Sequence, residues 1–289
     1  LLKKHAGLDI QAMYPASDQP GPGAENWTWD TYLKAAQACH KAGVPFGLPI
    51  GQFSDATDWI GSMFQSFNAV LVNEKGDITV KSDSVRQVLE YAKQLAAVMP
   101  NDVFSWDDAS NNRALISGKS ALIFNPPSAW AVAKRDAPDV ANECWSFPSP
   151  AGANGRYTPY LPYFWGVWSF AKNKGAAKAL IEHLSEREQA QAMVAASGGY
   201  DIPPFGSMTN FDTWETEGPP KGVVYNYPVR PHHNAKQFIA CYPAPPEMAV
   251  QMYNQAIQAK MIARVVQSGA SIDSAISWAQ GELESFQRG

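Results

Sequence analysis

The sequence is poor in cysteine, and this shortage bounds its chemistry. Only three cysteines occur in 289 residues, Cys39, Cys144 and Cys241. An odd number cannot form a complete disulfide framework, and no CxxC pair is present for zinc or redox chemistry. We expect three buried, reduced thiols, with one bridge plus a free thiol as the alternative. The count by itself does not identify a cellular compartment.

Charged residues and long uncharged stretches are also scarce. Charged residues make up 17% of the chain, the net charge is −4, and apolar residues make up 45%. This composition is typical of a globular protein and excludes intrinsic disorder. A mildly acidic chain has no overall field that attracts phosphate backbones, so no nucleic-acid partner is expected. The longest windows without charge, 59–73 and 157–171, have 15 residues each, which is too short for a membrane-spanning helix.

Recognisable catalytic and metal-binding motifs are missing. The sequence contains no GxSxG, HExxH, P-loop or GxGxxG pattern. The one histidine pair, His232-His233, lies in a proline-rich loop without a third ligand at usable spacing. We therefore expect no metal, no cofactor and no catalytic residue.

Paired carboxylates are the only feature that favours an enzyme. Asp55 and Asp58, and likewise Asp107 and Asp108, lie on or near expected helix starts. Such pairs catalyse glycoside hydrolysis in other proteins, but helix N-termini favour acidic residues in any case. A glycoside-processing enzyme that uses Asp55, Asp58 or Asp107 is kept as an alternative.

The N-terminus has neither a methionine nor a signal segment. The chain starts at Leu1, with a helix-like Leu-Leu-Lys-Lys, and no basic stretch followed by an apolar one precedes the fold. We expect the chain to be a processed or trimmed piece of a longer, exported protein.

Helical periodicity and capping residues predict most of the secondary structure. Thr28 begins a helix that ends near Gly43, and Ser82 or Ser84 begins the clearest helix, which Pro100 ends. Further helices are expected from about 107 to 117, in tandem after Asn173, from 246 to 268, and after Ser271. A hairpin is expected at 71–80, with short strands at 121–124, 145–147 and 166–170. Strands separated by such helices predict an α/β fold with a mixed sheet flanked by helices.

Aromatic residues are abundant, and many lie in loops beside proline or glycine. The 34 aromatics include ten tryptophans. Flat aromatic faces beside a few polar side chains suit sugars, because a pyranose stacks its C–H face on an indole. We expect Trp59 and Trp130 to be partly exposed and to point into one depression. The tryptophans expected in the core are Trp27, Trp29, Trp145, Trp168 and Trp278.

Several stretches resemble one family in order and spacing across nearly the whole chain. Residues 2–8 are similar to its "lfkkAGL", 28–33 to its "TWdel", and 115–122 to its "f..GkaAm", with Trp130 at the downstream tryptophan. The segment 166–204 is similar to its strand, paired helices and "g.lP" turn. The chain thus resembles the extracellular solute-binding proteins of ABC importers, the sugar-type family that includes maltose-binding protein.

The resemblance implies a periplasmic-binding-protein-like fold, of which this chain is essentially the C-terminal lobe. By analogy, residues 1–205 and 241–289 form that lobe, and residues 206–240 cross to an N-terminal lobe that is otherwise absent. We expect the crossing segment to be poorly anchored, with exposed apolar side chains at Phe211, Trp214, Val223 and Val224. The family has a small glycine where Pro126-Pro127 stands, so the loop before Trp130 is expected to differ in shape.

The resemblance also implies a function. It implies capture of a sugar or polyol in an inter-lobe cleft, delivery to a membrane permease, a periplasmic or extracellular location, and no catalysis. An anionic or phosphorylated solute, with counter-charges from Arg156, Arg230, His232 and His233, is the alternative ligand. The residues expected to face the ligand are Trp59, Asp58, Asn125, Trp130, Phe164, Trp165, Gly199 and Tyr200.

Overall fold

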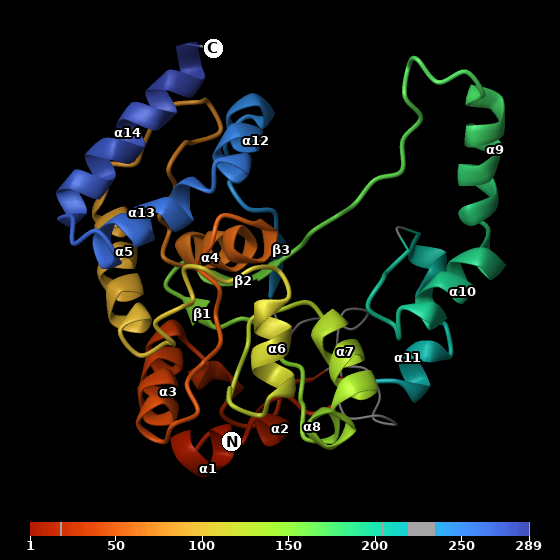
Figure 1. Cartoon of the computed structure of the whole chain (residues 1–289), viewed down its shortest axis with the longest axis horizontal. Coiled ribbons are helices and arrows are strands. Elements are labelled where there is room, and N and C mark those ends of the chain that lie inside the picture. The colour runs from red at the N-terminus through yellow and green to blue at the C-terminus, as the bar shows by residue number, and fades with distance from the viewer. Residues whose placement is uncertain (18, 204, 219–234, 289) are drawn as a thin grey trace.

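A computed structural model describes all residues except 18, 204, 219–234 and 289. Figure 1 shows a body, which carries both ends of the chain, and a helix over residues 174–184 that stands apart from it. The helices of the body are α1 (Leu2–Ala6), α2 (Ile10–Met13), α3 (Trp29–Lys41), α4 (Ser54–Ser66), α5 (Asp83–Ala96), α6 (Ser110–Ile116), α7 (Ser128–Asp136), α8 (Pro138–Asn142), α12 (Pro246–Asn254), α13 (Ile257–Val266) and α14 (Ile272–Arg288), with the 3-10 turn η1 (Ala24–Asn26).

Capping explains why the helices of the body begin where they do. The Thr28 hydroxyl accepts a hydrogen bond from the Thr31 amide, and the Ser82 hydroxyl accepts one from the Val85 amide, each at 3.3 Å. These caps and helices confirm the sequence-based predictions for α3 and α5. The expected single helix over 246–268 is instead two helices, because Ala256 adopts a positive φ of 49° between α12 and α13.

The sheet is small and mixed. Its strands are β1 (Ala151–Gly152), β2 (Gly155–Pro159) and β3 (Lys236–Phe238), in the order β1-β2-β3. β1 and β2 pair antiparallel, and β2 and β3 pair parallel. Helix α4 packs on β2, so the sheet lies directly against one face of α4.

Several expected strands form only isolated pairs or no pairs. Within the described residues, the predicted hairpin is a single antiparallel bridge from Val72 to Ile78, and the predicted strand 121–124 is a single bridge from Ile123 to Gly47. The strands expected at 145–147 and 166–170 do not form. Residues 166–170 have the right apolar pattern, but they have no neighbouring strand to pair with.

Two separate clusters of buried side chains hold the fold together. The large cluster joins α1 to α5 with α12 to α14, and the rings of Trp29 and Tyr32 meet edge to face in it. The small cluster joins α7 and α8 to α10 (Arg187–Ala196) and α11 (Thr213–Thr216). An ion pair of 2.6 Å between Lys134 and Glu217 supports this second contact.

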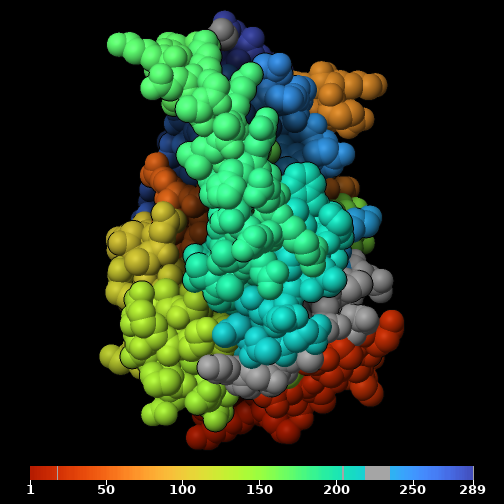
Figure 2. Space-filling view, turned by 90° about the vertical axis from the view of Figure 1, so that its right-hand side faces the viewer, coloured from red at the N-terminus to blue at the C-terminus, as the bar shows by residue number. Residues whose placement is uncertain are grey.

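One segment has almost no packing. After Tyr160, whose amide still bonds to the Phe238 carbonyl, the chain runs outward to α9 (Lys174–Leu184) and returns through α10, the 3-10 turn η2 (Gly206–Met208) and α11. We call residues 161–184 the arm. No residue of α9 is buried, and in the space-filling view α9 stands at the outer edge of the molecule (Figure 2). Among the described residues, no helix is both long and apolar enough to cross a lipid bilayer.

The structure also corrects two expectations about packing. Trp168 was expected in the core but is 73% exposed, because the arm leaves the body before reaching it. Phe211 and Trp214 were expected to be exposed but are buried, stacked on one another at 5.4 Å in the small cluster. Val223 and Val224, and much of the predicted crossing segment, lie outside the described residues.

Candidate functional site

A cluster of amide and carboxylate side chains lies where α4, α6 and the loop before α7 meet. We call Asp55, Asn111, Asn112 and Asn125 the Asp-Asn cluster. The Asn111 amide donates to Asp55 Oδ2 at 2.9 Å and to Asn125 Oδ1 at 2.5 Å. The Asn125 amide donates in turn to Asn112 Oδ1 at 2.9 Å. Three segments far apart in the sequence are therefore joined by one chain of hydrogen bonds.

Local backbone structure positions each member of the cluster. Asp55 stands in the first turn of α4, and Asn111 and Asn112 stand in the first turn of α6. Asn125 immediately precedes the two prolines that lead into α7. Asn111 is fully buried, whereas the other three are half-buried. The buried Asn111 amide thus holds together a polar rim of three half-buried side chains.

The electrostatics of the cluster are mildly acidic. Burial raises the pKa of Asp55, the hydrogen bond from Asn111 opposes the rise, and the nearby charge of Asp108 adds to it. The Ser54 hydroxyl lies 3.5 Å from Asp108 Oδ1 on the exposed side. Asp107 has no part in this, because it is exposed and pairs with Ser110 and Arg113, which lower its pKa. No described group of three or more histidine, cysteine or acidic residues could hold a metal ion.

The tryptophans predicted to face a ligand are buried. Trp59 is 2% exposed and donates to the Pro49 carbonyl at 2.7 Å, and Trp130 is 4% exposed and donates to the Ala141 carbonyl at 3.3 Å. They belong to different clusters, Trp59 to the large one and Trp130 to the small one. The expectation that they share one open depression is therefore wrong, because both rings fill core space between helices.

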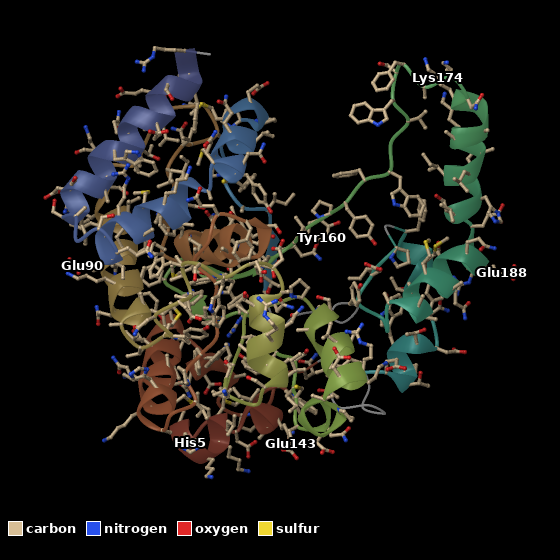
Figure 3. The ribbon with its side chains drawn as sticks, in the orientation of Figure 1. His5, Glu90, Glu143, Tyr160, Lys174 and Glu188 are labelled. Atoms are coloured by element: carbon tan, nitrogen blue, oxygen red, sulfur yellow. The ribbon has the colours of Figure 1, made fainter. Side chains whose placement is uncertain are left out.

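The other predicted site residues do not converge either. Phe164 and Trp165 lie on the arm and are 86% and 45% exposed; Figure 3 shows this stretch running from Tyr160, at the edge of the body, to Lys174. The Gly199 carbonyl accepts a hydrogen bond of 2.8 Å from Trp214, and Tyr200 follows it half-buried. Only Asn125 belongs to the Asp-Asn cluster.

Asp58 lies one turn of α4 beyond the cluster and is 8% exposed. Its carboxyl faces the interior between α4 and α12 rather than the polar rim. Its predicted contact with a ligand stays a prediction. Sequence reasoning missed Asn111 and Asn112, for which the only signal was a pair of asparagines at a helix start.

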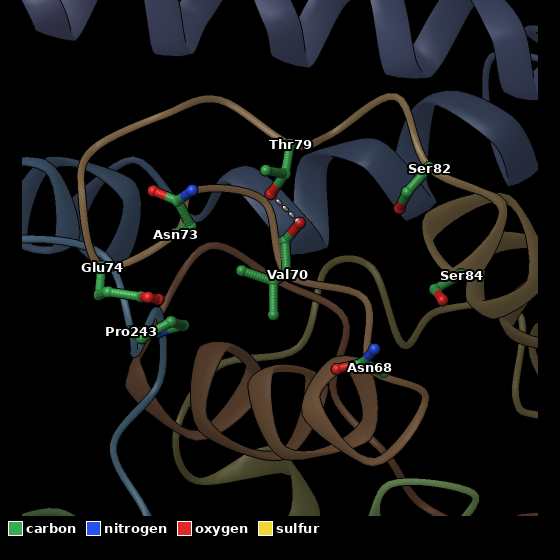
Figure 4. A pocket seen from close by; sticks show the side chains of 8 residues that line it. All are labelled: Asn68, Val70, Asn73, Glu74, Thr79, Ser82, Ser84 and Pro243. Carbon is green, nitrogen blue, oxygen red and sulfur yellow. Dashed lines mark hydrogen bonds between the residues drawn. The ribbon is translucent and has the colours of Figure 1, made fainter.

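Two hollows lie elsewhere. A polar one of about 280 Å³ is shown in Figure 4. It contains no aromatic side chain and none of the predicted site residues, so it does not suit a stacked sugar. Its lining residues are Asn68, Val70, Asn73, Glu74, Thr79, Ser82, Ser84 and Pro243. The other hollow, of about 450 Å³, is an apolar groove on the arm between Trp165 and the Leu180 side of α9.

Solved structures with the same fold carry sugars. Maltose-bound T. maritima MalE3 has a TM-score of 0.73 and 18% identity, covering 89% of this chain and 65% of that one. The ABC transporter solute-binding protein from Thermotoga lettingae TMO, bound with alpha-D-tagatose, has a TM-score of 0.69 and 18% identity, covering 99% and 68%. The sugar transporter from Arthrobacter chlorophenolicus A6, with bound laminaribiose, has a TM-score of 0.69 and 15% identity, covering 90% and 64%.

These likenesses establish the fold, which is the expected periplasmic-binding-protein-like α/β fold. The chain spans about two thirds of the length of these neighbours. No curated protein sequence matches the chain. The sequence profile of bacterial extracellular solute-binding proteins matches residues 10–218, which is more than half of the chain. The resemblance noted in the sequence is thereby confirmed, and the chain belongs to the bacterial extracellular solute-binding protein family.

Proposed function

We propose that this chain is the substrate-binding component of an ABC importer and captures a neutral sugar or polyol for a membrane permease. The observation that carries the proposal is the Asp-Asn cluster, which joins α4, α6 and the loop before α7 in one hydrogen-bonded rim. Family membership and the sugars bound to structural neighbours support it. Family membership also supports a periplasmic or extracellular location.

The chemistry of the cluster suits hydroxyl groups. A carboxylate accepts hydrogen bonds, and each asparagine amide can both donate and accept, so neighbouring hydroxyls of a sugar find partners of both kinds. An anionic solute fits less well. Arg156, one of the expected counter-charges, is buried and donates to the carbonyls of Ser149 and Ala24, away from the cluster. The others, Arg230, His232 and His233, lie outside the described residues.

A glycoside-processing enzyme is the weaker alternative. Glycoside hydrolysis needs two carboxyl groups that face one substrate. Asp55 is half-buried at the rim, Asp58 is buried behind it, and Asp107 is exposed and ion-paired with Arg113. We therefore propose binding without catalysis, and turnover of any glycoside would contradict that.

The proposed protein has two lobes, with this chain supplying mainly the second. The arm supports this, because no residue of α9 is buried and the aromatic side chains of Phe164, Trp168 and Phe170 are largely exposed. We propose that the arm packs against a first lobe, whereas Phe211, Trp214 and β3 of the predicted crossing segment 206–240 pack within this chain. The proposed crossing then begins at Leu161, where the chain leaves the body, earlier than the sequence suggested.

A ligand screen with matched variants tests the proposed function. Sugars, polyols, sugar phosphates and polyamines are added to the full-length protein, because a ligand that binds only the folded state raises the unfolding midpoint. We expect a neutral sugar or polyol to raise it. Asn125→Ala is expected to weaken the binding of that ligand by about 1–3 kcal/mol, as loss of a central contact does. The exposed Asn101→Ala serves as the control. A shift caused only by phosphates, or equal affinity in both variants, would overturn the proposal.

A further inference from the structure

Helix α4 also carries a buried acidic residue, Asp58, one turn beyond Asp55. Asp58 and Gly61 lie one turn apart on it, and Asp58 is buried. Gly61 lets the chain after β3 approach closely, since a Cβ at this position would lie 2.9 Å from the Cβ of Ala240. Ala240 and Cys241 are both buried. The segment that follows β3 is therefore seated directly on α4, beside the carboxyl of Asp58.

The surroundings of Asp58 contain few groups that can stabilise a negative charge. Tyr253 of α12 approaches it, but its hydroxyl makes no hydrogen bond of good geometry. Cys241 faces it from the segment after β3, and Asp55 adds a like charge from α4 itself. The Oε1 atom of Gln258, at the start of α13, is also buried near Gly61 without a partner.

These surroundings favour the neutral acid. Burial raises the pKa of Asp58 to about 7, Tyr253 opposes the rise, and the charge of Asp55 adds to it. Burial first, and then Asp58, raise the pKa of Cys241 to about 12, so the thiol stays neutral. A buried carboxylate without a cation or sufficient donors is costly, and the packing around it loosens to admit water.

The position of the Asp58 carboxyl links its charge to the packing of β3 on α4. Ala240 and Cys241 continue directly from β3, and β3 pairs with β2. The chain leaves the body for the arm just after β2, and the Tyr160 amide at this exit donates to the Phe238 carbonyl at the end of β3 (Figure 1). We propose that Asp58 is a proton-controlled latch: as a neutral acid it holds the segment 239–242, and through it β3, against α4, and on ionisation it releases them.

Hydrogen exchange across a pH series tests the latch in the full-length protein. After correction for intrinsic exchange, we expect the amides of 236–242 to exchange through a local opening whose free energy is smaller than that of global unfolding. Their protection should fall roughly tenfold or more between pH 5.5 and pH 8, since the opened state binds fewer protons. Amides of α1, which is distant from Asp58, provide the internal reference and should not change.

Two variants and one direct titration make the outcome decisive. Asp58→Asn keeps the shape without a charge, so protection at 236–242 should become independent of pH, whereas the exposed control Asp139→Asn should behave as the wild type. Tyr253→Phe should move the transition to higher pH, because it removes the group that favours the carboxylate. The latch is wrong if Asp58→Asn keeps the pH dependence, or if 236–242 is as strongly protected as the core at every pH. Carbon NMR of the wild type decides the matter if a variant fails to fold, since an Asp58 midpoint near 4 would also overturn the proposal.

Discussion

At the scale of single residues, neighbours in the sequence do not distinguish a core tryptophan from an exposed one. Both Trp59 and Trp165 are expected from the sequence to face a ligand, yet Trp59 lies inside α4 and fills the core, whereas Trp165 lies on the arm. Trp59→Ala should cost about 3–5 kcal/mol of unfolding free energy, through lost burial and a cavity. Trp168→Ala on the arm should cost less than about 0.5 kcal/mol. Urea unfolding measures both, and equal losses would contradict the packing described above.

Asn111 is the residue that orders the candidate site. It is fully buried, and its amide serves both Asp55 and Asn125. Asn111→Ala should destabilise the fold by about 1–3 kcal/mol, because it leaves the half-buried acceptors of Asp55 and Asn125 without their donor. It should also raise the pKa of Asp55 further, since the hydrogen bond from Asn111 lowers that pKa. NMR titration of the Asp55 carboxyl checks the direction, and a fall in the pKa would show that another group controls it.

The charge of Asp58 sets a pH dependence of global stability. Its pKa is about 7 in the fold and near 4 in the unfolded chain, so the folded state binds more protons between these values. The contribution of Asp58 to the unfolding free energy should therefore be largest below pH 4, and it should be lost as the pH rises to 7. At pH 8, Asp58→Asn should be more stable than the wild type by roughly 2–4 kcal/mol. A less stable variant at pH 8 would contradict the assignment.

At the scale of elements, the sequence predicts helix starts where a side chain caps the helix with a hydrogen bond. It does not predict helix breaks that tertiary packing imposes. Thr28 and Ser82 cap α3 and α5 as the sequence indicates, whereas Asn173 precedes α9 without a side-chain cap bond. Thr28→Ala should cost about 1 kcal/mol and Asn173→Ala close to nothing. Thermal unfolding compares the two variants. If Asn173→Ala lost as much stability as Thr28→Ala, the Asn173 side chain would have to stabilise the start of α9, which would contradict the absence of a cap bond.

The limits of sequence reasoning at this scale have physical causes. The break at Ala256 has no local signal, because alanine favours helix and only packing forces its positive φ. The apolar run 166–170 has a strand pattern, but a strand requires a partner that no described segment supplies. The Asp-Asn cluster joins residues up to 70 positions apart, from Asp55 to Asn125, and no spacing rule brings such residues together. Capping and amphipathic periodicity are local properties, which is why the helices were the predictable part.

At the scale of the whole molecule, the arm is the weak point of the isolated 289 residues. Its aromatic side chains, including Phe164, Trp168 and Phe170, are largely exposed. Chymotrypsin cleaves after such residues, so brief digestion should cut within 161–173 and leave buried sites such as Phe64 intact. In a protein that also carries the proposed first lobe, the same bonds should be protected. Equal cleavage of both proteins would show that the arm does not pack on a first lobe.

The same reasoning predicts how affinity is divided between the lobes. A two-lobed binding protein closes around its ligand by a hinge and removes water from both sides of it. The Asp-Asn cluster joins α4, α6 and the loop before α7, so the hydrogen bonds it offers come from one lobe of the proposed protein. The 289 residues alone should therefore lose several kcal/mol of sugar affinity relative to the longer protein, and each 1.4 kcal/mol is about tenfold. Calorimetry with one sugar on both proteins measures the difference. Equal affinities would mean that the Asp-Asn cluster binds the sugar without help from the first lobe. The first lobe would then close the cleft but add nothing to the binding free energy.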